Sequence, residues 1–291
     1  MQIQQLHPLF VGEITGLDTS VPVTSETVRA VEDAMARYAV CVIRDASLKD
    51  EDHIRFSRAF GPLELPPPGN KRIAPELYDI SNLDASGEIK PPNPTAPNPA
   101  DFERFHTDSP FNSLPTKWSL LLAYVTPPEG ANTEYVDMRA VYEDLPQEMK
   151  DRIANLHAEH DLFRALKRGG VEFGNEAMRK AFPTMPHPCV RTSASGRKAL
   201  YLGWHAVAIV GWGEAEGQKL LDELYAFATQ PKYVYSHQWR PRDLVIWDNR
   251  CTMHSPTPFE RYRYKRDMRR TTINEYGPEV SGMENMRPAA G

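Results

Sequence analysis

The feature of this sequence that most limits its fold is a series of short apolar runs, each ended by turn-forming residues. Strands commonly span about four to eight residues and are bounded by Gly, Pro, Asn, Asp or Ser. Runs of this kind cover residues 40–43, 77–81, 118–125, 133–138, 199–202, 233–239, 244–247 and 271–276. The sequence contains neither a G-x-G-x-x-G motif nor a P-loop, which would favour a parallel, doubly wound sheet. We therefore predict a mainly β fold, a sandwich or barrel, with flanking helices.

Helices are predicted where apolar residues recur at spacings of three and four. The first begins at Ser25, which we take as its N-cap, and the second begins with a capping box formed by Ser47 and Asp50. The predicted helices cover residues 25–38, 48–60, 146–160 and 214–229. These helices provide a scaffold and carry no recognisable chemistry of their own.

Length and composition predict a globular protein. The chain has 291 residues, of which 41% are hydrophobic and 25% charged, so it can bury a substantial core. A β fold of this size often forms one unit, and we predict a single domain over residues 1–291. Small and polar residues dominate 277–291, which we predict to be a mobile tail.

Charge and cysteine usage limit the partners and the compartment. The 34 basic and 39 acidic residues form no basic block, so we expect no nucleic-acid partner. Apolar stretches such as 118–125 are far shorter than the roughly 20 residues of a membrane helix, and the N-terminus does not resemble a signal peptide. The three cysteines are widely spaced, which predicts buried thiols and a cytoplasmic location.

A proline-rich segment precedes the most informative motif of the chain. Five prolines fall within residues 91–99, and proline cannot donate to a β ladder. Long loops in compact domains are often covers over active sites. We predict that residues of about 84–105 form such a lid.

Two histidines and a carboxylate form a candidate metal site. His106 and Asp108 are two residues apart, so on a strand both side chains point to the same face. His254 follows the strand and turn predicted around 244–250. Two histidines and one carboxylate form the facial triad of non-haem Fe(II) oxygenases. Zinc accepts the same ligands, so a zinc hydrolase stays open, as does a binding module without catalysis.

An iron oxygenase also needs two electrons, which 2-oxoglutarate can supply by losing CO2. Its distal carboxylate requires a fixed cation, and the planar fork of arginine suits a carboxylate. The arginine-rich segment 265–273 follows His254 closely, and Thr133 offers a further hydroxyl donor.

Together these motifs resemble one family. The sequence is similar to the taurine dioxygenase and 2,4-dichlorophenoxyacetate dioxygenase (TauD/TfdA) family of Fe(II)/2-oxoglutarate enzymes. The resemblance rests on H-T-D at 106–108, G-A-N-T at 130–133, W-D-N-R at 247–250 with His254, and the segment 266–273. Further matches at 61–64, 79–82, 136–140 and 195–198 are closest to the phenoxyacetate branch.

The resemblance implies a fold, a set of cofactors and residue roles. The fold would be a double-stranded β-helix, or jelly roll, and the cofactors Fe(II), 2-oxoglutarate and O2. By resemblance, three residues are the iron ligands, two hold the distal carboxylate of 2-oxoglutarate, and one binds the anionic group of the substrate. These are His106, Asp108 and His254 for iron, Thr133 and Arg266 for 2-oxoglutarate, and Arg270 for the substrate.

The motifs and the resemblance determine the substrate less directly than the cofactors. A small organic carboxylate, aryloxyacetate-like, is our leading prediction, with succinate and CO2 released. Hydroxylation, desaturation or cyclisation of an amino-acid or natural-product carboxylate, or oxidation of a sulfonate, stays open, and so does a homo-oligomeric state. Asn82 and His205 are weaker candidates for substrate contact. Within 203–208, Trp204 and Ala208 depart from the family's pocket-lining pattern, as Ala131 and Asn132 depart from its G-G-D-T turn.

Overall fold

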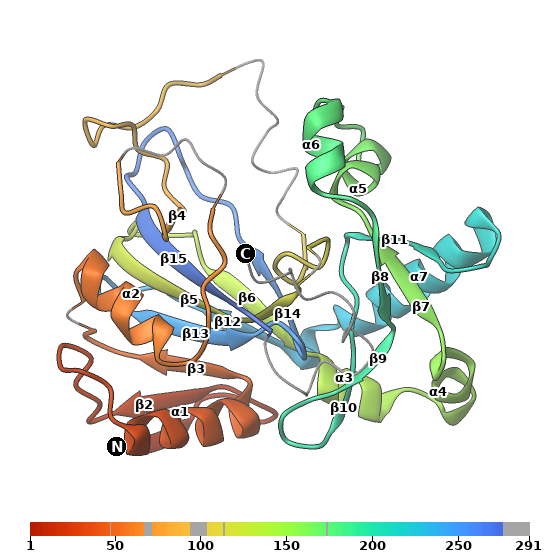
Figure 1. Cartoon of the computed structure of the whole chain (residues 1–291), viewed down its shortest axis with the longest axis horizontal. Coiled ribbons are helices and arrows are strands. Elements are labelled where there is room, and N and C mark those ends of the chain that lie inside the picture. Colours follow the sequence, from red (N-terminus) through yellow and green to blue (C-terminus); the bar gives the residue numbers. More distant parts are fainter. Residues whose placement is uncertain (47, 67–71, 94–103, 113, 173, 276–291) are drawn as a thin grey trace, which may run out of the picture.

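Two β-sheets, in which most neighbouring strands are antiparallel, face each other at the centre of the protein (Figure 1). The computed structural model describes residues 1–46, 48–66, 72–93, 104–112, 114–172 and 174–275. In spatial order, the main sheet contains β1 (Gln2–Gln5), β2 (Gly12–Thr15), β3 (Val40–Ile43), β13 (Leu244–Asp248), β5 (Thr116–Val125), β15 (Asp267–Asn274) and β4 (Tyr78–Asp79). Its neighbours are antiparallel except β2 and β3, which run parallel.

The second sheet is smaller and closes the sandwich. It contains β12 (Val234–His237), β6 (Thr133–Asp137) and β14 (Thr252–Pro256) in that order. The ring of Tyr135 in this sheet lies 5.6 Å from the ring of Trp247 in the main sheet, centroid to centroid. The two rings belong to one buried apolar cluster, so the sheets pack face to face. The predicted mainly β fold with flanking helices is confirmed.

Two helices cover the outer face of the main sheet. They are α1 (Ser25–Tyr38) and α2 (Asp50–Arg58). Side chains alternate between faces along β13, so Ile246 packs with the helices while Trp247 faces the second sheet. This double burial explains why β13 reads as a continuous apolar run.

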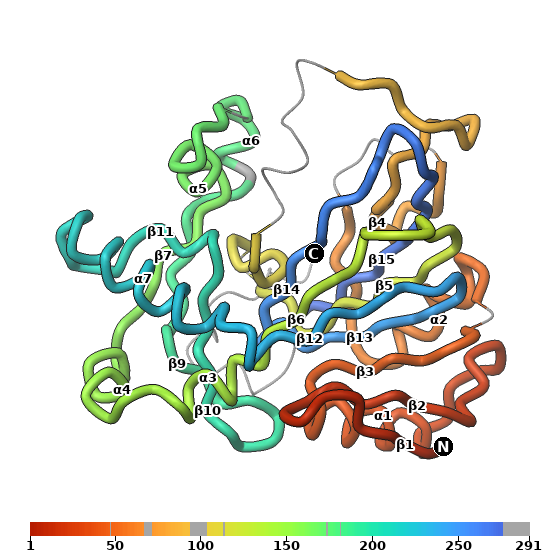
Figure 2. Tube along the Cα trace, turned by 180° about the vertical axis from the view of Figure 1, so that it is seen from behind, coloured from red at the N-terminus to blue at the C-terminus, as the bar shows by residue number. Residues whose placement is uncertain are grey.

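A second group of elements lies to one side of the sandwich, as Figures 1 and 2 show from opposite directions. Its strands are β7 (His157–His160), β8 (Met185–Pro188) and β11 (Ala206–Ile209), which form one sheet, and the hairpin of β9 (Val190–Thr192) and β10 (Lys198–Leu200). Its helices are α3 (Met138–Asp144), α4 (Gln147–Ile153), α5 (Leu162–Arg168), α6 (Glu176–Ala181), α7 (Glu214–Ala228) and the short 3-10 helix η2 (Pro231–Tyr233). One apolar cluster joins α3 and α7 to these strands.

Some helix predictions were wrong in their limits. The helix predicted over 146–160 ends at Ile153, and the last four residues form β7, where buried and less buried side chains alternate. The second helix begins after Lys49 without a side-chain cap, so the predicted capping box does not define its start; Ser47 lies outside the described residues. The first helix is capped by Thr24 and not by Ser25.

Two predicted segments lie wholly or partly outside the described residues. They are 94–103, within the predicted lid, and the tail 277–291. All three cysteines are free and buried, as predicted. No helix in the described part of the chain has the length and apolar character needed to cross a membrane.

The packing of β13 predicts the effect of a core truncation. Ile246 is fully buried, so Ile246→Ala should lower the free energy of unfolding by about 2–5 kcal/mol through lost burial and a cavity. Urea unfolding followed by circular dichroism measures this. The exposed Val210 provides the control, since Val210→Ala should change stability by less than about 0.5 kcal/mol. Equal effects of the two substitutions would contradict the assigned packing.

Candidate metal centre and its cavity

The triad expected from the sequence is assembled in the structure. One ligand atom from each of His106, Asp108 and His254 lies within 4.8 Å of the others. The H-x-D segment is not a regular strand; it touches β14 through a single antiparallel bridge. In that bridge the amide of His106 donates to the carbonyl of His254 (2.9 Å) and the reverse bond is 2.8 Å. Two backbone bonds therefore join ligands almost 150 residues apart in the sequence.

Neighbouring groups orient the ligands. The Nδ1 of His106 lies 2.7 Å from the carbonyl oxygen of Arg104, which directs the other ring nitrogen to the centre. The hydroxyl of Ser119 donates to Asp108 (2.6 Å). The ring of His254 packs 4.7 Å from that of Trp247. Ser119 was missed in the sequence, although a polar residue inside the apolar run 118–125 was a usable signal.

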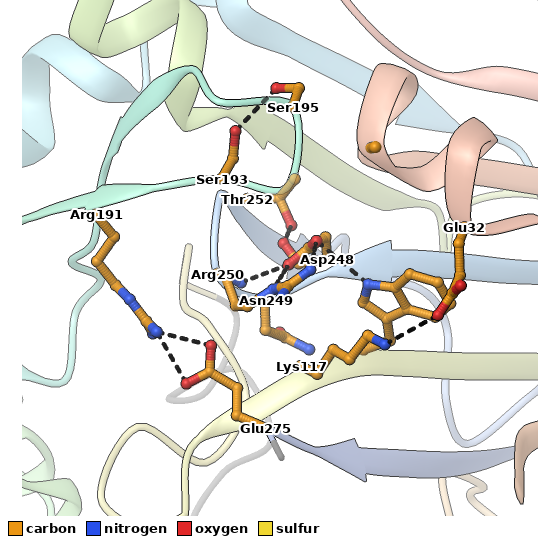
Figure 3. Close-up of polar contacts among 12 residues, drawn as sticks. Glu32, Lys117, Arg191, Ser193, Ser195, Asp248, Asn249, Arg250, Thr252 and Glu275 are labelled. Atoms are coloured by element: carbon orange, nitrogen blue, oxygen red, sulfur yellow. Dashed lines mark hydrogen bonds and ion pairs between the residues drawn. The ribbon is translucent and has the colours of Figure 1, made fainter. Parts of the chain in front are cut away.

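The turn between β13 and β14 is rigidly held (Figure 3). The carboxylate of Asp248 accepts from the guanidinium of Arg250 (2.7 and 2.9 Å) and from the indole of Trp118 (3.2 Å). The Asn249 side chain accepts from the backbone amide of Asp108 (2.9 Å) and donates to Ser119 (3.0 Å). Asp248 therefore fixes the turn before His254, and Asn249 joins this turn to the segment of Asp108.

The electrostatics of the triad suit a divalent cation. Burial lowers the pKa of His106 and lowers the pKa of His254 to about 3, so both imidazoles are neutral. Burial alone would raise the pKa of Asp108, but the guanidinium of Arg270 and the hydrogen bond from Ser119 hold it below its usual range. Two neutral imidazoles and one carboxylate are a donor set for Fe(II), Mn(II) or Zn(II), so the residues fit the metal that the motif implies.

A cavity of about 520 Å³ opens beside the triad, between the two sheets. It brings together most of the predicted site residues with apolar side chains of the main sheet and of the 256–261 segment. The predicted site residues in its lining are His106, His254, Thr133, Arg266, Arg270 and Asn82. The apolar side chains in its lining include Ile80, Leu121, Trp247 and Phe259.

Arg266 is a buried cation in the cavity wall. Its Nη1 donates to the carbonyl of Ile80 (3.1 Å), and no carboxylate in the described part of the chain pairs with it. Burial lowers the pKa of Arg266 to about 10, so it stays charged at neutral pH. A buried, uncompensated charge is costly, and an anion in the cavity would offset that cost. Thr133 accepts from the indole of Trp239 (3.0 Å) and can donate its own proton to the same anion.

Arg270 lies on β15, four residues after Arg266, and lines the same cavity. It pairs with Asp108 and stacks 4.7 Å from the ring centroid of Tyr78. Its neighbour Arg269 faces the opposite side of the sheet and pairs with Asp50, because side chains alternate between faces along a strand.

Asn82 and His205, the two weaker candidates for substrate contact, differ in their position relative to the cavity. Asn82 lines the cavity, but its amide donates to the carbonyl of Tyr264 (2.9 Å) and accepts from the amide of Arg266 (2.8 Å), so it holds the segment before Arg266. His205 is buried with its ring 5.7 Å from that of His106, and it is not among the described lining residues. Their contact with substrate stays a prediction.

Trp204 does not enter this cavity either. It packs with Leu166 and Val207 in a separate cluster and borders a smaller cavity of about 150 Å³. None of the residues 203–208 is among the described residues that line the cavity at the triad. The bulk of Trp204 therefore does not narrow the space beside the metal ligands.

A jelly-roll sandwich with a His-Asp-His triad beside a buried arginine is the arrangement of a non-haem dioxygenase. The family described as "Taurine catabolism dioxygenase TauD, TfdA family" matches residues 2–272, and the chain belongs to this family. The predicted resemblance, jelly-roll fold and enzyme class are confirmed.

The relatives are similar over most of their length. The alpha-ketoglutarate-dependent 2,4-dichlorophenoxyacetate dioxygenase of Burkholderia sp. (strain RASC) is 40% identical over 279 residues, 92% of this chain and 93% of that protein. The (S)-phenoxypropionate/alpha-ketoglutarate-dioxygenase of Sphingobium herbicidovorans is 33% identical, over 79% of this chain and 80% of the relative. The crystal structure of AAD-2 in complex with Mn(II) and N-oxalylglycine superposes with a TM-score of 0.87 at 37% identity and covers 97% of this chain and 100% of that one.

The triad predicts a sharp loss of metal binding on truncation. Asp108→Ala removes the one anionic ligand, so affinity for Fe(II) or Mn(II) should fall by more than about 100-fold. Anaerobic calorimetry or equilibrium dialysis measures this. The matched control is His157→Ala, which removes an exposed imidazole and should leave metal affinity unchanged. Undiminished binding by the Asp108 variant would refute the assigned ligand set.

Proposed function

We propose that this Fe(II)- and 2-oxoglutarate-dependent dioxygenase oxidises a C–H bond of a small organic carboxylate, with an aryloxyacetate as the leading substrate class. The observation that carries the proposal is that Arg266 and Arg270 both lie in the wall of the cavity beside the triad, while the third arginine of its lining, Arg261, stacks on the ring of Phe259. Two anchors provide for two anions beside one metal, a co-substrate and a substrate.

The chain's own residues would divide the work as follows. Arg266 and Thr133 hold the distal carboxylate of 2-oxoglutarate, while His106, Asp108 and His254 hold the metal. When bound, iron and 2-oxoglutarate supply the oxidising power, because decarboxylation to succinate and CO2 provides the electrons that split O2. The apolar cavity walls exclude water around the reacting atoms.

Arg270 would bind the substrate carboxylate and so decide which C–H bond faces the metal. Ile80, Leu121 and Phe259 line the remaining space, which suits an apolar or aromatic body attached to that carboxylate. In an aryloxyacetate, hydroxylation next to the ether oxygen gives a hemiacetal that collapses to a phenol and glyoxylate. The names of the phenoxyacetate and phenoxypropionate relatives support this class.

Product analysis separates this substrate class from its alternatives. Purified enzyme with Fe(II), 2-oxoglutarate and O2 is offered aryloxyacetates, amino acids and sulfonates, and phenol, glyoxylate and succinate are measured. Phenol and glyoxylate in equal amounts support the proposal. Turnover of amino acids, natural-product carboxylates or sulfonates, with no turnover of any aryloxyacetate, would contradict the proposed substrate class and replace it with the class that is oxidised.

We place the enzyme in the cytoplasm as one functional unit over residues 1–291, a proposal that the three buried free thiols support. Cell fractionation tests the compartment. Size-exclusion chromatography with light scattering determines whether the chain forms a homo-oligomer.

Loss of Arg266 distinguishes the dioxygenase from a zinc hydrolase on the same triad. Arg266→Ala should raise the KM for 2-oxoglutarate on the order of 100-fold, because charge-assisted hydrogen bonds contribute about 1.5–3 kcal/mol. Steady-state succinate formation measures this. Arg263→Ala, which removes an exposed guanidinium paired with Glu260, is the control and should leave the KM unchanged. An Arg266 variant with unaltered activity would favour the hydrolase.

Loss of Arg270 should uncouple the two half-reactions. Arg270→Ala keeps the metal ligands and the 2-oxoglutarate anchors, so decarboxylation should continue without oxidation of the aryloxyacetate. The ratio of succinate to phenol, near one in the wild type, should then rise steeply. A normal ratio at a normal substrate KM would remove Arg270 from the proposed mechanism.

A further inference from the structure

We infer that Tyr78 and Glu64 are positioning residues for the substrate carboxylate. The ring of Tyr78 supports the guanidinium of Arg270, and Glu64 joins that ring to the metal-binding segment. The inference rests on the proposed role of Arg270. It adds two residues that affect how the substrate is placed, although neither of them binds the metal, the co-substrate or the substrate.

Strand pairing places the ring under the guanidinium. Tyr78 is the direct cross-strand partner of Arg270 in the β4–β15 pair, and the Arg270 Cζ lies 4.7 Å from its ring centroid. A guanidinium over an aromatic face at this distance is attracted by the ring. Because β4 has only two residues at the edge of the main sheet, strand pairing alone holds Tyr78 weakly.

Glu64 provides the missing anchor. Its carboxylate accepts hydrogen bonds from the hydroxyls of Tyr78, Ser109 (2.8 Å) and Thr116 (3.4 Å), which come from three separate segments. Burial raises the pKa of Glu64, and the bonds from Tyr78 and Ser109 oppose that rise. The acid therefore acts as a shared acceptor for hydroxyl groups.

The same carboxylate stabilises the backbone next to a metal ligand. Ser109 follows Asp108 and has a φ of 46°, in the left-handed region that is unfavourable for serine. The bond from its hydroxyl to Glu64 holds this conformation. Glu64 thus links the segment of Asp108 to the ring of Tyr78, which supports Arg270. These contacts fix the distance between the metal ligands and the guanidinium of Arg270.

This distance decides where the substrate's C–H bond lies. Arg270 donates through Nη1 to Asp108, and its Nε has no partner among the described residues. With the ring of Tyr78 below it, the guanidinium plane can turn little, so its remaining donors keep one direction toward a carboxylate. Small errors in such placement can cost about 100-fold in rate.

The opposite face of the sheet contains a matched control. Arg269 stacks 4.2 Å from the ring centroid of Tyr124, whose hydroxyl donates to Asp50 (3.0 Å). This pair also joins an arginine of β15 to a tyrosine with an acidic partner. Neither Arg269 nor Tyr124 is among the described residues that line the cavity.

The test compares Tyr78→Leu and Tyr78→Phe with Tyr124→Leu and Tyr124→Phe. Phenoxyacetate is the probe, and the readouts are its KM and kcat, the succinate-to-phenol ratio, the KM for 2-oxoglutarate and the melting temperature. Substrate binding is also followed without turnover, as the phenoxyacetate-induced shift of the visible Fe(II)–2-oxoglutarate band under anaerobic conditions.

For Tyr78→Leu we expect a rise in the KM for phenoxyacetate of roughly five- to tenfold, the size of one cation–π contact, and a raised succinate-to-phenol ratio. The KM for 2-oxoglutarate should not change. Tyr78→Phe keeps the ring and loses the bond to Glu64, so it should raise the ratio with a smaller change in KM, and it keeps the test valid if the leucine variant folds poorly. The Tyr124 variants should lower only the melting temperature.

Two failures are distinguishable. If the wild type oxidises phenoxyacetate and the Tyr78 variants match the Tyr124 variants in KM, ratio and band shift, the positioning role is overturned. If Arg270→Ala itself couples normally, the proposed function of Arg270 fails, and with it the reason for a support beneath it.

Discussion

The whole site depends on one antiparallel bridge between His106 and His254. Its two backbone hydrogen bonds hold the H-x-D segment against β14, although that segment belongs to no regular strand. Asn249 strengthens the same junction by accepting from the amide of Asp108. The bridge and the Asn249 contact together fix the H-x-D segment relative to His254.

Buried charge then determines what the cavity can accept. Arg266 lies in the wall with no carboxylate partner among the described residues, while Arg270 is held between Asp108 and a tyrosine ring. By contrast, the buried Arg250 is neutralised by Asp248 in the neighbouring turn (Figure 3). The fold thus neutralises Arg250 internally, whereas the charge of Arg266 can be offset by an anion in the cavity. Arg270 pairs with Asp108 but keeps an unpartnered Nε among the described residues, so it also retains a donor for an acidic substrate.

Predictions from sequence patterns were wrong at positions where contacts with distant segments determine the structure. Residues 157–160 continue a helix-like stretch, yet they pair with β8 and β11 and become a strand. Trp204 was expected near the substrate from its place in a family pattern, but its ring packs against α5 instead. Glu64 and Tyr78 gave no signal of a joint role. Nothing in the sequence shows that the edge strand β4 places Tyr78 under Arg270, or that Glu64 lies between Tyr78 and Ser109.

Residue types and spacing predicted the triad, from a two-residue H-x-D spacing and a later histidine, but left iron and zinc open. The family resemblance then implied iron, 2-oxoglutarate and the role of each arginine. The period of two along a strand is a local property as well, and it is enough to place Arg269 and Arg270 on opposite faces of β15. The direction of each donor and the partner of each buried charge were decided only by the folded chain. Those properties depend on contacts between segments far apart in sequence, such as the β4–β15 pair and the hydroxyls gathered on Glu64, and no local pattern encodes them.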